Sequence, residues 1–238
     1  MKKRYIRHAS ELVTCKGSAP KHGKEMSDIG LIKDGAVIIH DDKIVAVGTT
    51  EELDKQINDE YEVIDATGKT VMPGFVDSHT HFIFGGYRAD EFSWRLKGDS
   101  YMSIMERGGG INATVVPTRE ASLEELMETG EERLNRMLEF GVTTVEGKSG
   151  YGMDCETELK MLRAMKNLNE KHPVDIVSTF LGPHSVLPEW KGKEKEFLDE
   201  QLNHVMPIVK EEGLAEFADI FTEKNVFSVE DSEYYMTK

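Results

Sequence analysis

The sequence predicts an α/β protein in which a small β domain precedes a parallel sheet, either open or closed into a barrel. One observation is a set of short β-rich runs and polar turns over residues 1–70. Another is the alternation of strand and helix patterns over residues 71–238, which is typical of parallel sheets. A third is the continuous apolar run over residues 174–181, as expected of a strand buried on both faces. We therefore expect two domains, 1–70 and 71–238.

The first domain contains a clear hairpin signal. Two β-rich runs, residues 35–40 and 43–48, flank the polar pair Asp41-Asp42. Residues 63–66 predict another short strand. These patterns favour a small β domain.

The second domain contains four predicted strands and three well-marked helices. The strands are expected over residues 75–81, 142–146, 174–181 and 217–221. A capping box at Ser122 opens a helix that Gly141 closes. A second helix is expected over residues 155–171 with Asp154 as its N-cap, and a third follows it, with a kink at Pro207.

Composition excludes several classes of function. The chain has 238 residues, of which 39% are hydrophobic and 31% charged, which fits a globular protein. Its net charge of −15 argues against a nucleic-acid partner but not against a small anionic substrate. No apolar run approaches the ~20 residues of a membrane span, and the basic start lacks the apolar core of a secretory signal. Cys15 and Cys155 form no disulfide or zinc pattern, so we expect reduced thiols in a cytoplasmic protein.

His79-Thr80-His81 is the motif that carries most chemistry. Side chains two residues apart in a strand project from the same face, with their Cα atoms roughly 6–7 Å apart. Two imidazoles so placed can converge on one metal ion at about 2.0–2.1 Å each. The alternative is a pair of histidines satisfied by hydrogen bonds at the end of a strand.

With these patterns laid out, the chain resembles the amidohydrolase superfamily and, within it, the imidazolonepropionase family. The superfamily motif is Pro73-Gly74-Phe75-Val76-Asp77-Ser78-His79-Thr80-His81, at the end of the first barrel strand. The narrower resemblance rests on blocks spread along the chain, at residues 84–88, 101–105, 108–111, 141–146, 148–152, 174–180 and 216–219.

The resemblance implies a metal-dependent TIM-type (β/α) barrel with a small β-sandwich built from both ends of the chain. It implies hydrolysis of 4-imidazolone-5-propanoate to N-formimidoyl-L-glutamate in histidine degradation, one zinc or iron ion, a cytoplasmic location and a homodimer. A TIM barrel typically needs ~250 residues by itself. We therefore expect an incomplete barrel of about four strand-helix units, the N-terminal portion of such an enzyme. The further metal ligands and the general acid/base would then lie beyond Lys238.

The resemblance also implies roles for individual residues. His79 and His81 are the expected metal ligands. Arg88 and Tyr151 are expected to bind the anionic imidazolone substrate, and His184 to bind it and to stabilise the oxyanion. Further candidates are Tyr101, whose block has helical spacing typical of packing, and Glu223, expected at the end of the fourth strand. For each of these residues an ordinary structural role is the competing interpretation.

Two other functions stay open at this point. One is another cyclic amidohydrolase, acting on a hydantoin-like or guanine-like ring. The other is a catalytically inactive half barrel, which would expose apolar strand edges and lack part of its metal ligands. We expect the 238-residue chain to be inactive alone.

Overall fold

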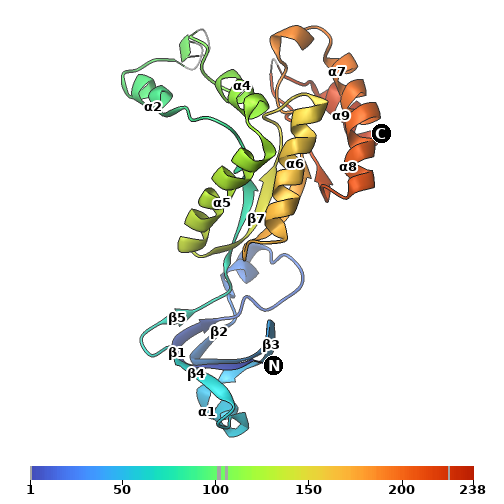
Figure 1. The fold of residues 1–238 in the computed structure, drawn as a ribbon. Helices are drawn as coiled ribbons and strands as arrows, with labels where there is room; N and C mark the ends of the chain where they lie inside the picture. The colour runs from blue at the N-terminus through green and yellow to red at the C-terminus, as the bar shows by residue number, and fades with distance from the viewer. Residues whose placement is uncertain (1, 101–102, 105–106, 225) are drawn as a thin grey trace. The chain divides into compact units, whose positions relative to one another are not determined.

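The computed structural model describes residues 2–100, 103–104, 107–224 and 226–238, and it divides the chain into two compact units. The units are Met1–Gly74 and Phe75–Lys238 (Figure 1). None of the described helices is long and apolar enough to cross a membrane.

The N-terminal unit is built on a single mixed sheet. Its strands are β1 (Lys3–Val13), β2 (Leu31–His40), β3 (Lys43–Thr49), β4 (Tyr61–Asp65) and β5 (Thr70–Val71). The order is β3-β2-β1-β4, with β5 also paired to β1. β2 and β3 form the predicted antiparallel hairpin, and Asp41 in its turn has a φ of 52°. Short helices lie at α1 (Thr50–Leu53) and in 3₁₀ turns at Gly23–Ser27 and Asp54–Gln56.

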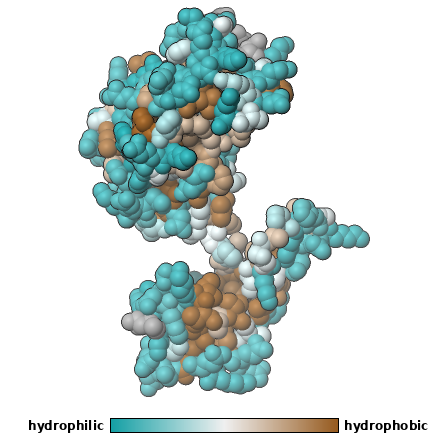
Figure 2. Space-filling view, turned by 90° about the vertical axis from the view of Figure 1, so that its right-hand side faces the viewer, coloured by the Kyte–Doolittle hydropathy of each residue, from teal (hydrophilic) through white to brown (hydrophobic). Residues whose placement is uncertain are grey.

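The core of this unit is small. Tyr5, Ile38 and Leu53 pack in one buried cluster, while Leu12 and Val37 belong to another. Several large apolar side chains stay exposed, among them Ile44 at 67% and Val63 at 50%. Figure 2 shows hydrophobic surface, in brown, over this unit. The described strands of the unit all belong to one sheet, so the β-sandwich remains a prediction.

The C-terminal unit contains the predicted parallel sheet. Its strands are β6 (Phe75–Thr80), β7 (Val142–Lys148), β8 (Asp175–Phe180) and β9 (Phe217–Ala218), in the order β6-β7-β8-β9. Each neighbouring pair is parallel. The sheet forms part of a barrel, and its edge strands expose Val76 and Phe217 at 67% and 61%.

The fourth strand is shorter than predicted. We expected residues 217–221, but β9 ends at Ala218. The backbone N–H of Phe221 donates to the carbonyl of Pro183, which lies beyond the end of β8, and Asp219 Oδ1 accepts the N–H of Ile220. The chain therefore leaves the strand ladder after two residues.

Helices flank the sheet and connect its strands. They are α2 (Ala89–Leu96), α4 (Asn112–Glu120), α5 (Leu123–Glu139), α6 (Cys155–Asn169), α7 (Glu194–Glu200), α8 (Met206–Glu212) and α9 (Val229–Thr237), with a 3₁₀ turn at Pro188–Trp190. The capping box at Ser122 and the N-cap at Asp154 are confirmed. The interruption near Pro207 is a π-helical turn at Gln201–Val205 between α7 and α8, since proline cannot donate the regular helical hydrogen bond.

The core of the C-terminal unit lies where α5 and α6 pack side by side against the sheet (Figure 1). Leu134 of α5, Met165 of α6, and Val145 and Ile176 of the strands belong to one buried cluster. This core fixes the carboxyl ends of β6, β7 and β8 at one edge, where the polar side chains gather.

Candidate functional site

The candidate site lies at the carboxyl ends of the parallel strands, where enzymes of barrel architecture place their active sites. β6 ends at Thr80, between the two histidines of the motif. The hydroxyl of Thr80 donates to the carbonyl of Glu146 in β7 at 2.6 Å. This bond ties the histidine-bearing end of β6 to its neighbour.

Three imidazoles and a phenol singled out from the sequence meet at this edge. The rings of His79 and His81 have centroids 5.8 Å apart, and His81 stacks on His184 at 4.7 Å with an interplanar angle of 7°. The ring centroid of Tyr151 lies 4.9 Å from that of His81 and 5.4 Å from that of His184. The structure thus brings together four of the residues singled out from the sequence.

His81 is held as a neutral imidazole. Burial lowers its pKa to about 3, with help from the nearby His184, His79 and Lys148. Its buried Nδ1 has no hydrogen-bond partner among the described residues. A neutral imidazole with an unpaired ring nitrogen fits a metal ligand.

His184 is oriented by the loop that follows β7. Its Nδ1 lies 2.9 Å from the carbonyl oxygen of Gly150. A carbonyl accepts but cannot donate, so Nδ1 carries a proton and Nε2 of the neutral ring is an acceptor. Burial lowers the pKa of His184, which favours this neutral form.

Tyr151 is held as a protonated phenol. Burial raises its pKa, while the charge of Arg88 acts in the opposite direction. A protonated phenol can donate to a substrate oxygen.

Arg88 directly precedes α2 and is about one-third exposed. Its Nη1 lies 3.9 Å from Oε2 of the buried Glu91, whose Oε1 accepts the backbone N–H of Gly110 at 2.7 Å. Glu91 therefore links Arg88 to the glycine-rich segment at residues 108–110. Tyr101, a further candidate, lies outside the described residues.

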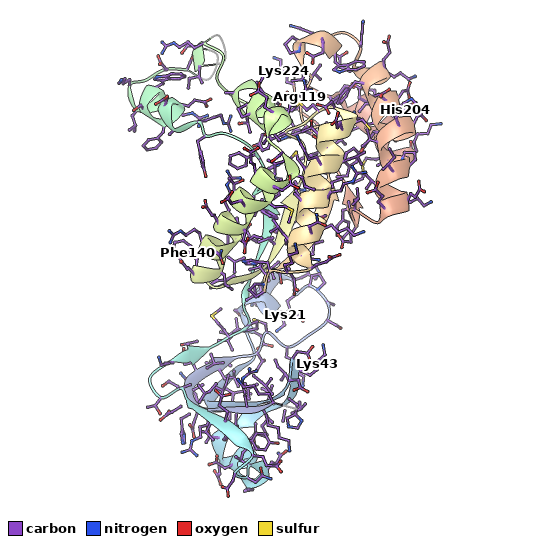
Figure 3. The ribbon with its side chains drawn as sticks, viewed as in Figure 1. Lys21, Lys43, Arg119, Phe140, His204 and Lys224 are labelled. Carbon is purple, nitrogen blue, oxygen red and sulfur yellow. The ribbon has the colours of Figure 1, made fainter. Side chains whose placement is uncertain are left out.

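Among the described residues, Glu223 makes no hydrogen bond or ion pair with the histidine cluster. It is exposed, and its Oε1 accepts the backbone N–H of its neighbour Lys224 at 2.7 Å. Because β9 ends at Ala218, Glu223 lies in a turn rather than at the end of a strand. The expectation that it ends the fourth strand is wrong, and Lys224 in Figure 3 marks the position of this turn.

A partly buried ion-pair network, with Lys148 as its buried member, lies at the same edge and was not predicted. Lys148 Nζ donates to Glu146 Oε1 at 2.8 Å and to Asp219 Oδ2 at 3.0 Å. The hydroxyl of Thr179 also donates to Glu146 Oε1, at 2.7 Å. The available signal was the spacing of Glu146 and Lys148, two residues apart at the end of a buried strand. Like His79 and His81, side chains at this spacing project from the same face of the sheet.

The described residues do not supply a complete metal site. No group of three or more His, Cys, Asp or Glu side chains that could hold an ion occurs among them. A tetrahedral site takes four ligands, of which a catalytic site usually draws three from protein. His79 and His81 therefore fit as two members of a larger donor set.

Comparisons with known proteins identify relatives of the chain. The model of the amidohydrolase family matches residues 62–114. Imidazolonepropionase of Parabacteroides distasonis is 56% identical over 229 residues, which cover 96% of this chain and 55% of the relative. Imidazolonepropionase of Clostridium tetani is 50% identical over 98% of this chain and 56% of its own length. The chain thus spans about half the length of the curated relatives it matches.

Solved structures share the fold at low sequence identity. Escherichia coli guanine deaminase superposes with a TM-score of 0.58 at 18% identity, over 97% of this chain and 48% of the deaminase. A triazine hydrolase superposes with a TM-score of 0.53 at 14% identity, over 100% of this chain and 51% of the hydrolase. These similarities support the fold of a partial amidohydrolase barrel.

Proposed function

Because the chain belongs to the amidohydrolase family, we propose that it forms part of an imidazolonepropionase, which hydrolyses 4-imidazolone-5-propanoate to N-formimidoyl-L-glutamate in histidine degradation. The observation that carries this proposal is the 50–56% identity to imidazolonepropionases over at least 96% of the chain. The cluster of imidazoles and a phenol at the carboxyl ends of parallel strands supports it.

We propose that His79 and His81 hold one divalent metal, zinc or iron, since both metals accept imidazole ligands. The low pKa of His81 and its unpaired Nδ1 support this role. When bound, the metal supplies a water nucleophile at neutral pH. The remaining ligands and the general acid/base are proposed to lie in the half of the relatives that this chain does not span.

The substrate is proposed to lie between Arg88 and Tyr151. The propionate is a carboxylate, which a guanidinium binds bidentately. The protonated phenol of Tyr151 donates a hydrogen bond that orients the ring. Together the two side chains fix the reacting carbon against the histidine cluster, which lowers the entropic cost of attack.

The role of His184 depends on its protonation. In the neutral form its Nε2 is an acceptor, suited to an N–H of the imidazolone ring. Stabilisation of an oxyanion, the role expected from the sequence, requires a second proton on Nε2. We propose that substrate binding uses the neutral form. As negative charge develops on the substrate oxygen, Nε2 would take up the proton that the attacking water releases through the general base.

The other features of the family are also proposals for this chain. The N-terminal unit is proposed to be part of a composite β-sandwich, and the complete protein a cytoplasmic homodimer. We propose that the 238-residue chain is inactive alone, because the described residues supply two imidazoles rather than a complete metal site.

Turnover assays on the complete protein, translated from the whole reading frame, test the proposed function. The substrates are 4-imidazolone-5-propanoate, a hydantoin and guanine, with metal analysis in parallel. We expect turnover of the imidazolone alone and one equivalent of zinc or iron. Turnover of either other ring at a comparable kcat/KM, or no turnover with full metal content, would contradict the proposal.

A further inference from the structure

Glu158 is a buried carboxylate that the proposed chemistry does not use. It lies in the first turns of α6 and is fully buried. Its Oε2 accepts the backbone N–H of Gly150 at 2.9 Å, and its Oε1 accepts those of Gly152 and Met153, each at 2.8 Å. The three donors flank Tyr151 on both sides.

The loop closes tightly around this carboxylate. Gly150 has a φ of 108°, and a Cβ there would lie 2.6 Å from the carbonyl oxygen of Leu181. A Cβ on Gly152 would lie 2.6 Å from Thr157 Cβ. The loop backbone can therefore approach Glu158 only because glycines stand on both sides of Tyr151.

A second contact holds the loop from outside. Arg119 Nε, near the end of α4, lies 2.8 Å from the carbonyl oxygen of Gly152 and 2.7 Å from Asp154 Oδ2. Figure 3 labels Arg119 beside the start of α6. The carbonyl of Gly150 in turn meets Nδ1 of His184. The loop is thus fixed at Gly150, Gly152 and Met153, while the Tyr151 side chain points to the histidines.

Burial raises the pKa of Glu158, and the hydroxyl of Ser149 and the three backbone N–H groups oppose that rise. Each of these backbone groups donates, so the carboxylate acts only as an acceptor. Glutamine has the same shape but only one acceptor oxygen. Its amide group would face at least one backbone N–H as a second donor.

We propose that Glu158 is a positioning residue that sets the place of the Tyr151 phenol against the substrate. The proposal rests on the proposed function, because it takes Tyr151 to contact the imidazolone. Glu158 itself lies beneath the loop and acts through the backbone on either side of Tyr151.

Steady-state kinetics of Glu158→Gln in the complete protein test the proposal. We expect the KM for 4-imidazolone-5-propanoate to rise about tenfold, the effect of losing hydrogen bonds to a charged group. Metal content should stay at the wild-type level, since His79 and His81 lie at the end of β6 and make no hydrogen bond with Glu158. Glu156→Gln is the matched control, because Glu156 is an exposed acid in the same helical turn; its KM should stay within twofold of wild type.

A purely structural role would give a different pattern. A folded Glu158→Gln protein with lower metal content and kcat but an unchanged KM would overturn the proposal. If Glu158→Gln does not fold, Glu158→Asp keeps the acceptor charge but withdraws it by one methylene. Its KM should then rise at least threefold at full metal content, and an unchanged KM would overturn the proposal.

A double-mutant cycle with Tyr151→Phe shows whether Glu158 acts through the phenol. The increase in KM caused by Glu158→Gln should be at least threefold smaller in the Tyr151→Phe background, and full additivity would overturn the proposal. Amide exchange separates this failure from failure of the proposed function. If the wild type does not turn over the imidazolone, faster exchange at Gly150, Gly152 and Met153 in Glu158→Gln still reports whether the carboxylate holds the loop.

Discussion

The two loops that carry the proposed substrate contacts are held very differently. The loop after β7, which carries Tyr151, is fixed from inside by Glu158 and from outside by Arg119. The segment after β6, which carries Arg88, is linked to its glycine-rich part by Glu91. The side of the site proposed to bind the imidazolone ring is therefore held in place before substrate binds. On the side proposed to meet the propionate, the side-chain contact of Arg88 among the described residues is the 3.9 Å ion pair with Glu91, so we expect the guanidinium to be freer to adjust.

The largest expected effect comes from the histidine cluster, which lies between the two loops in the proposed site. His81→Ala in the complete protein should reduce metal content to background and abolish turnover, because it removes one of two proposed imidazole ligands. Inductively coupled plasma analysis and the turnover assay measure this. His204→Ala is the control, since His204 is exposed on another helix. Stoichiometric metal in His81→Ala would refute the ligand assignment.

A matched pair of glycine substitutions compares the two loops directly. Gly150→Ala should lower the free energy of unfolding by about 3 kcal/mol, because its φ is 108° and a Cβ would meet the carbonyl of Leu181. Gly108→Ala has a φ of 81° but meets no described atom within 4 Å, so it should cost about 1 kcal/mol. Urea unfolding of each variant measures the difference. Equal costs would show that the two loops are packed alike.

The network around Lys148 gives the next effect. Lys148→Met would leave Glu146 and Asp219 without their shared cation and should lower the free energy of unfolding by about 2 kcal/mol. The value is kept low because the side chain of Asp219 is 44% exposed, so water screens its charge. Lys171→Met, at an exposed position, is the control. A stability equal to that of the control would mean that the network does not hold β7 against the residues that follow β9.

Local signals explain what the sequence predicted well. The capping box at Ser122, the N-cap at Asp154 and the alternation of strands and helices depend on residues within a few positions of one another, so they were visible without a structure. The histidine motif has the same property, because its spacing of two is set by the strand itself.

Long-range contacts explain what the sequence did not show. Lys148 meets Asp219 across 71 positions, and no pattern in either segment announces the pairing. Glu158 looks like an ordinary acid in the first turns of a helix until the loop folds back over it. The prediction that Glu223 ends the fourth strand was wrong because a local pattern was overridden by a distant contact. Its apolar neighbours predicted a longer strand, while the tertiary hydrogen bond of Phe221 to Pro183 ends that strand early.

The smallest expected effect comes from Arg88, in the segment after β6. Arg88→Lys keeps the positive charge but loses the planar fork that binds a carboxylate bidentately, so the KM for the imidazolone should rise about tenfold while kcat and metal content stay near wild type. Arg95→Lys, in the helix that Arg88 precedes, is the control. An analogue without the propionate should bind wild type and Arg88→Lys equally. If Arg88→Lys instead lowers kcat and leaves KM unchanged, Arg88 acts on the reacting ring, and the freer side of the site is not where the propionate binds.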